Sequence, residues 1–161
     1  MHKIKNHRLT KRRDFLRVKN IGVSAKRYGL VMQMAKRDEP KQDGKDKISA
    51  IERKKTTGKD SVGNLRTGYT ASKYIGNAVI RNRAKRRMRA LVFEYEKATT
   101  NKKVNKKTNK KANLSFLPYA CDMVLIARQS TPSLPWSNLQ RQYNFLLKEC
   151  IDKLMGNKHK S

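Results

Sequence analysis

The sequence predicts an α+β or α/β sandwich, in which one small mixed β-sheet packs against helices. Two kinds of apolar pattern carry this prediction. Short alternating or continuous apolar runs are typical of strands, and longer stretches with apolar residues every three or four positions are typical of helices. These patterns follow one another in the order helix, strands, helix, strand, helix. A length of 161 residues suits one domain, which we expect to span 1–161.

The first predicted helix spans residues 10–20. Thr10 can cap its start, Phe15 lies on its apolar face, and Gly22 follows its end. Residues 28–36 then alternate between apolar and other side chains, which predicts a strand with one buried face.

Residues 66–72 alternate again and predict another strand. The segment between the two strands, residues 37–64, is polar and contains three glycines. It is too long for a tight turn, so we expect an extended, mobile hairpin loop inserted at this point.

The next predicted helix begins after Gly76-Asn77, which breaks the strand, and runs to about Glu96. At about 100° per residue, its apolar positions fall within one arc of roughly 80°. These positions are Ile80, Ala84, Met88, Leu91 and Tyr95. Six cations occupy most of the remaining circumference, with no acid before Glu94: Arg81, Arg83, Lys85, Arg86, Arg87 and Arg89.

Residues 99–113 consist almost only of Lys, Asn and Thr, a composition that predicts a disordered insertion. The apolar run within 121–128 predicts a strand buried on both faces. In the last helix, Ser137 and Gln140 resemble a capping box. Helical spacing of apolar residues continues as far as Gly156, through Leu139, Tyr143, Leu146, Leu147, Cys150 and Leu154.

The chain is strongly basic, with 40 Lys and Arg against 12 Asp and Glu and a formal net charge of +28. Such self-repulsion does not help folding, so it indicates a polyanionic partner. No apolar run approaches the ~20 residues that cross a bilayer, so we expect no membrane protein. The first residues are polar and unlike a secretory signal, which favours the cytoplasm.

Few residues are candidates for catalysis or for metal binding. Cys121 and Cys150 are far apart within apolar patterns, and we expect two buried free thiols. The three histidines lie near the termini, without Cys or acidic residues at metal-ligand spacing. The acids are scattered, so no pair is arranged for acid–base chemistry. We therefore expect no catalytic residue and no metal site in the protein.

The cations of the second helix favour RNA or another polyanion as the partner. Like charges four residues apart weaken an isolated helix by a few tenths of a kcal/mol per pair, and this helix accepts several such pairs. Five of the six cations are arginine, whose planar guanidinium binds phosphate through two parallel hydrogen bonds. A merely solvated face is the alternative, and the lack of any counter-charge argues against it.

A second basic cluster overlaps the first predicted helix and has Asp14 as its only acid. Its cations are Lys3, Lys5, Arg8, Lys11, Arg12, Arg13 and Arg17. Phe15 lies within this cluster and has two possible roles. It packs in the core, or it stacks on the bases of single-stranded RNA at the edge of a cleft.

One ordered set of motifs spans the second basic stretch: Arg66-Thr67-Gly68, Ser72-Lys73, Ile75-Gly76-Asn77-Ala78-Val79, Arg81-Asn82-Arg83, Lys85-Arg86 and Arg89. The flanking Arg8-Leu9-Thr10-Lys11 and Asp14-Phe15 fit the same pattern. Together these residues resemble the bacterial ribonuclease P protein subunit. The resemblance covers roughly 8–36, 65–97 and 119–154.

The resemblance implies a fold of order α-β-β-β-α-β-α, with a left-handed βαβ crossover that departs from the usual hand. It also implies a ribonucleoprotein endonuclease, a hydrolase of tRNA processing. Its catalytic RNA, with bound Mg²⁺, removes the 5′ leader of precursor tRNA. The protein, one copy per RNA, carries no chemistry of its own and is inactive alone. The expected partners are the ribonuclease P RNA and precursor tRNA.

Two sets of site residues follow by position from the resemblance. The set expected to bind the catalytic RNA is Lys73, Arg81, Asn82, Arg83, Lys85, Arg86 and Arg89. The set expected in a leader-binding cleft between the sheet and the first helix is Phe15, Arg8, Lys11, Arg12 and Arg66.

The chain also departs from the family pattern. Lys19 replaces an aromatic residue of the cleft, and Met32 or Gln33 replaces another, so charge carries more of the expected binding. The segments 37–64 and 99–113 are longer than the family needs, and we interpret both as passive insertions. The alternative function is that of a structural protein that binds ribosomal RNA, which would share the size and the charge.

Overall fold

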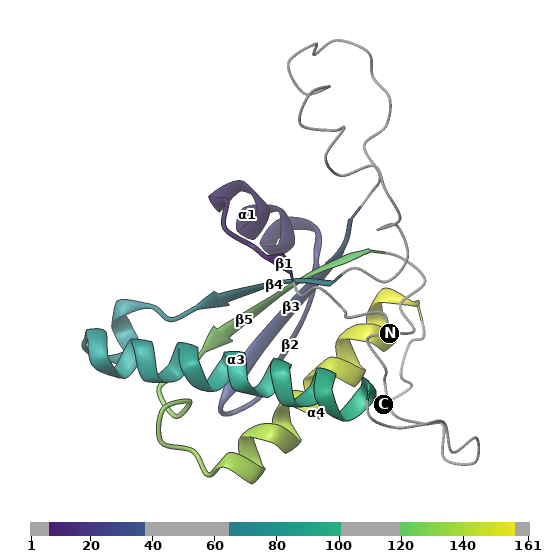
Figure 1. Ribbon diagram of the computed structural model, residues 1–161. Coiled ribbons are helices and arrows are strands. Elements are labelled where there is room, and N and C mark those ends of the chain that lie inside the picture. The colour runs from purple at the N-terminus through teal and green to yellow at the C-terminus, as the bar shows by residue number, and fades with distance from the viewer. Residues whose placement is uncertain (1–6, 38–64, 101–119, 157–161) are drawn as a thin grey trace.

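The computed structural model describes residues 7–37, 65–100 and 120–156, and all structural statements below refer to these ranges. They form one five-stranded sheet of order β1-β4-β5-β3-β2, with helices on both faces (Figure 1). In chain order the elements are β1 (His7–Arg8), α1 (Arg12–Ile21), β2 (Val23–Lys26), β3 (Leu30–Lys36), β4 (Leu65–Thr70), the short 3₁₀ helix η1 (Lys73–Ile75), α3 (Ala78–Thr100), β5 (Cys121–Ala127) and α4 (Trp136–Leu154).

The sheet is mixed, as the sequence predicts. β2 and β3 form an antiparallel pair, and β3 pairs antiparallel with the central strand β5. β4 pairs with β5 in parallel, and α3 connects the two strands in a βαβ unit. The element order α-β-β-β-α-β-α is confirmed from α1 onward, with β1 as an additional edge strand of two residues. The hand of the crossover stays a prediction.

The expected hairpin loop at 37–64 is wrong in its topology. β3 pairs with β2 and β5, and β4 lies on the far side of β5 from β3. The segment therefore connects two strands that are not neighbours. Apart from Arg37, it lies outside the described residues, as does the Lys/Asn/Thr-rich segment beyond Thr100.

Alternate residues of the central strands point to opposite faces of the sheet and build two apolar clusters. The larger cluster joins β3 and β5 to α3 and α4 through side chains such as Met32, Leu125, Met88 and Leu147. The smaller cluster lies under α1 and contains Leu9, Val18, Ala35 and Val124. The prediction that β5 is buried on both faces is confirmed.

The two cysteines are buried free thiols, as expected. Burial raises the pKa of Cys121 to about 11 and that of Cys150 to about 12. Both side chains are therefore protonated near neutral pH, and they contribute to the fold as small apolar groups.

Both helix caps expected from the sequence are wrong. α1 begins at Arg12, with Lys11 rather than Thr10 at its N-cap and no side-chain cap. α4 begins at Trp136 after Pro135, again without a side-chain cap. Gln140 instead donates to Glu94 Oε2 on α3, at 2.6 Å. An interhelical partner has replaced the local capping bond.

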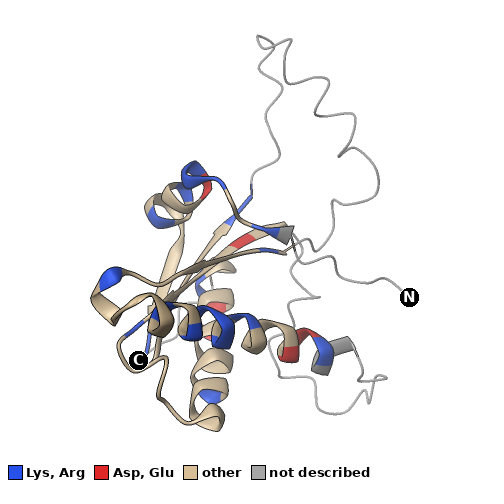
Figure 2. Cartoon of the chain, turned by 60° about the vertical axis from the view of Figure 1, so that its left-hand side comes forward, with Lys and Arg blue, Asp and Glu red and all other residues tan. Residues whose placement is uncertain are grey.

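Many of the described cations lie on α1 and α3, on opposite faces of the sheet (Figure 1 and Figure 2). None of the described helices is both long enough and apolar enough to cross a membrane.

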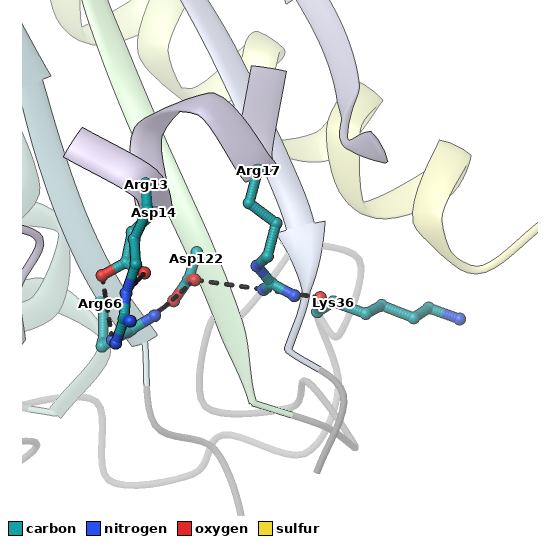
Figure 3. A network of polar contacts seen from close by, with 6 residues as sticks. All are labelled: Arg13, Asp14, Arg17, Lys36, Arg66 and Asp122. Atoms are coloured by element: carbon teal, nitrogen blue, oxygen red, sulfur yellow. Dashed lines mark hydrogen bonds and ion pairs between the residues drawn. The ribbon is translucent and has the colours of Figure 1, made fainter. Parts of the chain in front are cut away.

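A fully buried carboxylate, Asp122 of β5, ties α1 to the sheet (Figure 3). Arg66 binds it in bidentate fashion, with Nε to Oδ1 and Nη2 to Oδ2 both at 2.7 Å. Arg17 of α1 reaches Asp122 Oδ2 at 3.2 Å and the Lys36 carbonyl oxygen at 3.0 Å. Asp14 of α1 lies 3.6 Å from Arg66 Nη1. α1 and the strands β3, β4 and β5 are thus joined in one network.

The network also sets the charge state of Asp122. Burial by itself would raise the pKa of this carboxyl. The hydrogen bonds from Arg66 and Arg17 and the charges of Arg66 and Arg37 lower the pKa and outweigh burial. The pKa of Asp122 therefore lies below its ordinary value of 3.8. A carboxylate with a depressed pKa in the folded state stabilises the fold at neutral pH.

We predict that Asp122→Asn lowers the free energy of unfolding by about 2–4 kcal/mol. This is less than for a wholly buried pair, because both arginines keep part of their surface in water. The loss follows from leaving two guanidinium groups against the sheet without a counter-charge. Denaturant unfolding at neutral pH measures it.

The pH dependence provides the control. The contribution of Asp122 is present above about pH 4 and is lost as the pH falls through its folded-state pKa. The difference in stability between the wild type and Asp122→Asn should therefore shrink in acid. Asp152→Asn on α4 should cost less than about 1 kcal/mol. Equal effects of both variants at neutral pH would contradict the assignment.

Candidate nucleic-acid interface

The basic surface of α3 results from a helix that buries its opposite side. Ile80 N–H donates to Asn77 Oδ1 at 3.0 Å, so Asn77 caps the helix start. Ala84, Met88 and Leu91 are buried against the sheet, whereas Ile80, expected in the same arc, is exposed. With these residues facing the core, much of the remaining circumference faces solvent. Exposed site residues on this helix are Asn82, Arg83, Arg86 and Arg89.

Two other members of the predicted RNA-binding set lie at the N-terminal end of α3. Lys73 is exposed on η1. Arg81 is half-buried, and its Nη1 donates to the Gly76 carbonyl oxygen at 2.9 Å. This bond holds the turn from η1 into α3, so Arg81 positions the start of the basic helix.

Arg87, like Arg81, binds backbone carbonyl oxygens of the protein itself. Its Nη1 donates to the Thr131 carbonyl oxygen at 2.8 Å, and its Nη2 donates to the Leu134 carbonyl oxygen. The guanidinium also lies 5.7 Å from the centre of the Trp136 ring. Burial lowers the pKa of Arg87, and the charge of Arg83 lowers it further. Arg87 anchors the loop that precedes α4.

An open pocket of about 390 Å³ lies between α1, the C-terminal end of β4 and α3. It brings together members of both predicted site sets, namely Arg12 and Phe15 from the cleft set and Lys85 from the helix set. Tyr69, which belongs to neither predicted site set, also lines it. The remaining lining residues are Thr10, Thr70 and Ala71.

Phe15 packs in the core, which is one of the two roles that the sequence left open, and its ring also lines the pocket; the stacking role stays a prediction. It is half-buried and packs against the apolar cluster under α1. Its ring lies directly on the backbone of β4, since a Cβ added to Gly68 would be 2.6 Å from Phe15 Cε1. The same side chain lines the pocket. The glycine therefore lets an aromatic ring sit low on the sheet and still face the pocket.

Tyr69 contributes a second ring to this pocket and lies among cations. The guanidinium carbon of Arg89 is 5.8 Å from the centre of its ring. Burial raises the pKa of Tyr69, and the nearby charges of Arg89 and Arg8 partly oppose this. An aromatic ring between arginines is a suitable surface for an unpaired base with its phosphates.

The other members of the cleft set do not line the pocket. Arg8 on β1 and Lys11 before α1 are exposed beside it. Arg66 is held by Asp122 and Asp14, and its hydrogen bond to Asp122 is the main cause of its raised pKa. Arg66 thus acts beneath the cleft, where it fixes α1 against the sheet.

The described side chains of this surface carry cationic groups, aromatic rings and hydroxyl groups. Within residues 7–37, 65–100 and 120–156, no three His, Cys, Asp or Glu side chains group as a metal site would require. Arginine remains protonated at neutral pH and cannot act as a general base. The arrangement is suited to holding a polyanion.

Comparison with known proteins identifies relatives of one kind. The family model described as ribonuclease P matches residues 4–151. The ribonuclease P protein component of Paramagnetospirillum magneticum is 31% identical over 148 residues, which cover 91% of this chain and 79% of that protein. The corresponding component of Gluconacetobacter diazotrophicus is 35% identical over 86 residues, or 53% of this chain. That match covers 55% of the length of the relative. A match to the ribonuclease P protein component of Syntrophomonas wolfei covers 60% of the length of that protein.

Solved structures share the fold. The RNase P protein of Staphylococcus aureus is 25% identical, with a TM-score of 0.52 over 99% of this chain and 100% of that one. The RNase P protein of Thermotoga maritima is 20% identical, with a TM-score of 0.54 over 89% of this chain and 97% of that one.

We predict that Arg83 and Arg86 contact phosphates, whereas Arg87 stabilises the fold. Arg83→Gln and Arg86→Gln should each reduce the slope of log affinity for polyuridylate against log salt by about 0.7. Titrations at several salt concentrations measure this slope. Both side chains are exposed, and both variants should change the free energy of unfolding by less than about 0.5 kcal/mol.

Arg87→Gln is the matched control on the same helix. It should keep the salt slope but lower the free energy of unfolding by about 1–3 kcal/mol, because two loop carbonyls lose a charged donor. If it reduced the slope as much as the other two and left stability unchanged, the assignment would be reversed.

Proposed function

The chain belongs to the ribonuclease P protein family, and on this basis we propose that it is the protein subunit of a ribonuclease P holoenzyme. In this role it binds the catalytic RNA and the 5′ leader of precursor tRNA. It assists the endonucleolytic removal of the leader that gives the mature tRNA 5′ end. The assembly works in the cytoplasm, with one protein per RNA subunit.

The observation that carries this proposal is the pocket in which Arg12, Phe15 and Lys85 meet. These residues come from α1 and α3, far apart in the sequence. An aromatic ring and two cations around an open pocket suit a flexible single strand, because the ring stacks on any base and the cations bind its phosphates. A leader that precedes a folded tRNA is such a strand.

In this proposal the exposed arginines of α3 bind the catalytic RNA. Arg83, Arg86 and Arg89 point away from the core on a rigid helix, and each guanidinium can bind a phosphate through two hydrogen bonds. A folded RNA presents phosphates at fixed positions, so a row of arginines on one helix can bind several of them. This surface therefore receives the catalytic RNA, while the neighbouring pocket receives the leader.

Catalysis belongs to the RNA in this proposal. Mg²⁺ prefers oxygen ligands such as carboxylates, whereas the candidate interface offers guanidinium, ammonium and aromatic groups. These residues do not fit a magnesium site, and the ion, which would activate water for hydrolysis, is held by the RNA subunit. The protein contributes positive charge, which offsets the repulsion between two polyanions and positions the leader.

Reconstitution from purified components tests the proposal. The RNA-free protein with Mg²⁺ and precursor tRNA should give no cleavage, and adding the cognate ribonuclease P RNA should give cleavage at the mature 5′ end. The protein should also lower the Mg²⁺ concentration that the RNA needs. Replacing Arg83, Arg86 and Arg89 together by Gln should raise this requirement again.

A thermal melt of the triple variant, unchanged from that of the wild type, is the control for folding. Site-specific cleavage by rigorously RNA-free protein would contradict the proposal. So would a failure of the wild-type protein to bind the ribonuclease P RNA.

We further predict that Phe15→Leu weakens the binding of precursor tRNA to the holoenzyme. The loss should be about 1–3 kcal/mol in binding free energy, the usual contribution of a stacked base. Leucine keeps apolar contact with Gly68 but removes the ring. Affinities for precursor tRNA and for the same tRNA without its leader measure the effect, and only the first should fall. Phe15→Tyr keeps the ring and should bind normally, whereas equal losses for both RNAs would assign Phe15 to packing alone.

A further inference from the structure

A second pocket, also of about 390 Å³, lies at the end of the sheet where β4 and β5 finish. The turn between β2 and β3 forms its other wall. Its lining residues are Tyr28, Ser72, Tyr74, Ile75, Ala127, Arg128, Gln129 and Ser130. None of them belongs to the two predicted site sets. The volume lies within the range of about 300–1,000 Å³ that is usual for sites of small ligands.

Two tyrosines of this pocket are unusually exposed. Tyr28 is 71% exposed and Tyr74 is 82% exposed, whereas Tyr69, Tyr95 and Tyr143 are half-buried or buried. Burial of an aromatic ring is strongly favourable, so two exposed rings beside one pocket indicate a partner that covers them. The floor between them is apolar, formed by Ile75 and Ala127, which are almost completely buried.

The polar groups of the pocket favour a nucleotide as this partner. Arg128 is exposed at the rim, and Lys73 is exposed next to Tyr74 in the sequence. The lining contains no carboxylate. The amide of Gln129 and the hydroxyl of Ser72 can donate to and accept from the edge of a base. Rings for a base, cations for a phosphate and polar groups for the base edge occur together.

The walls of the pocket are fixed by hydrogen bonds between distant segments. Ser130 Oγ donates to the Tyr28 carbonyl oxygen at 2.8 Å, and Thr131 Oγ1 donates to the Gly29 carbonyl oxygen at 2.6 Å. Gly29 N–H donates to Gln142 Oε1 of α4 at 2.7 Å. Arg87 holds the same loop from α3. A site formed before its ligand arrives loses less entropy on binding.

The two pockets adjoin along the chain. Thr70 and Ala71 line the pocket of Phe15, and the next residue, Ser72, begins the lining of the second one. A strand of RNA that passes over this end of β4 therefore meets both.

We propose that this second pocket binds an unpaired nucleotide of RNA, with its base stacked on Tyr28 or Tyr74 and its phosphate on Arg128. The proposal rests on the proposed function only in that the chain binds RNA. The nucleotide comes from the leader of precursor tRNA or from the catalytic RNA, and the experiment distinguishes these sources.

Variants of the two tyrosines provide the first test. Tyr28→Leu and Tyr74→Leu remove the rings, Tyr28→Phe and Tyr74→Phe keep them, and Phe93→Leu alters a 66% exposed ring on α3 outside both pockets. We expect the double Leu variant to bind its RNA at least about 5-fold more weakly. The double Phe variant and Phe93→Leu should remain within about 2-fold of the wild type.

Three RNAs identify the source of the nucleotide: the cognate ribonuclease P RNA alone, and precursor and leaderless tRNA on the assembled holoenzyme. A loss confined to precursor tRNA assigns the nucleotide to the leader, and a loss with the ribonuclease P RNA assigns it to that RNA. In the wild-type complex, 5-iodouridine placed in the RNA so identified should crosslink to Tyr28 or Tyr74 on irradiation.

The proposal would be overturned by unchanged affinity of the double Leu variant for all three RNAs. Equal losses in the Leu and Phe variants would also overturn it, since the hydroxyl groups rather than the rings would then matter. In either case, weaker binding of RNA by the Arg83→Gln variant than by the wild type would leave the proposed function intact. If the wild-type protein bound none of the RNAs, the proposed function itself would fail.

Discussion

The pairing of Asp122 with Arg66 and Arg17 is the interaction on which the candidate interface depends. A chain with a net charge of +28 must bring a basic helix onto a sheet that itself carries arginine. One buried carboxylate in the central strand makes this possible, because it binds an arginine from each side. α1 is thereby fixed over β3 and β5, and the Phe15 ring comes to lie on Gly68 of β4. The pocket between α1 and α3 is a consequence of this contact.

The arginines of α3 show how one residue type serves two purposes on one helix. Arg87 lies beside a loop with two carbonyl oxygens directed toward it, and it stabilises the fold. Arg83 and Arg86 are exposed and remain available for an external anion. The guanidinium suits both purposes, because it has five donors and stays charged when partly buried. Charge along a sequence therefore identifies a basic helix but does not identify which of its cations face a partner.

The sequence predicts well those structural features that depend on residues close to one another along the chain. The apolar run at 123–127 predicted the buried central strand, and the spacing from Leu139 to Cys150 predicted the core face of α4. The ordered motif around Arg81-Asn82-Arg83 pointed to the correct family. What was missed depends on partners far away in the chain. β2 is a short strand whose backbone pairs with β3. Gln140 does not cap the start of α4, because its side chain binds Glu94 on α3 instead. Asp122 looked like an isolated acid, since both of its arginines come from other elements.

The topology explains why both pockets lie at the same end of the molecule. β4 and β5 are parallel, so their carboxyl ends meet at one edge of the sheet, together with η1, the start of α3 and the loop after β5. Side chains from separate segments converge there, as they do in other sheets with parallel strands. The opposite edge holds the end of β3 and the starts of β4 and β5, where Lys36, Leu65 and Cys121 are in register. The described residues on either side of 38–64 both lie at this edge, away from the two pockets.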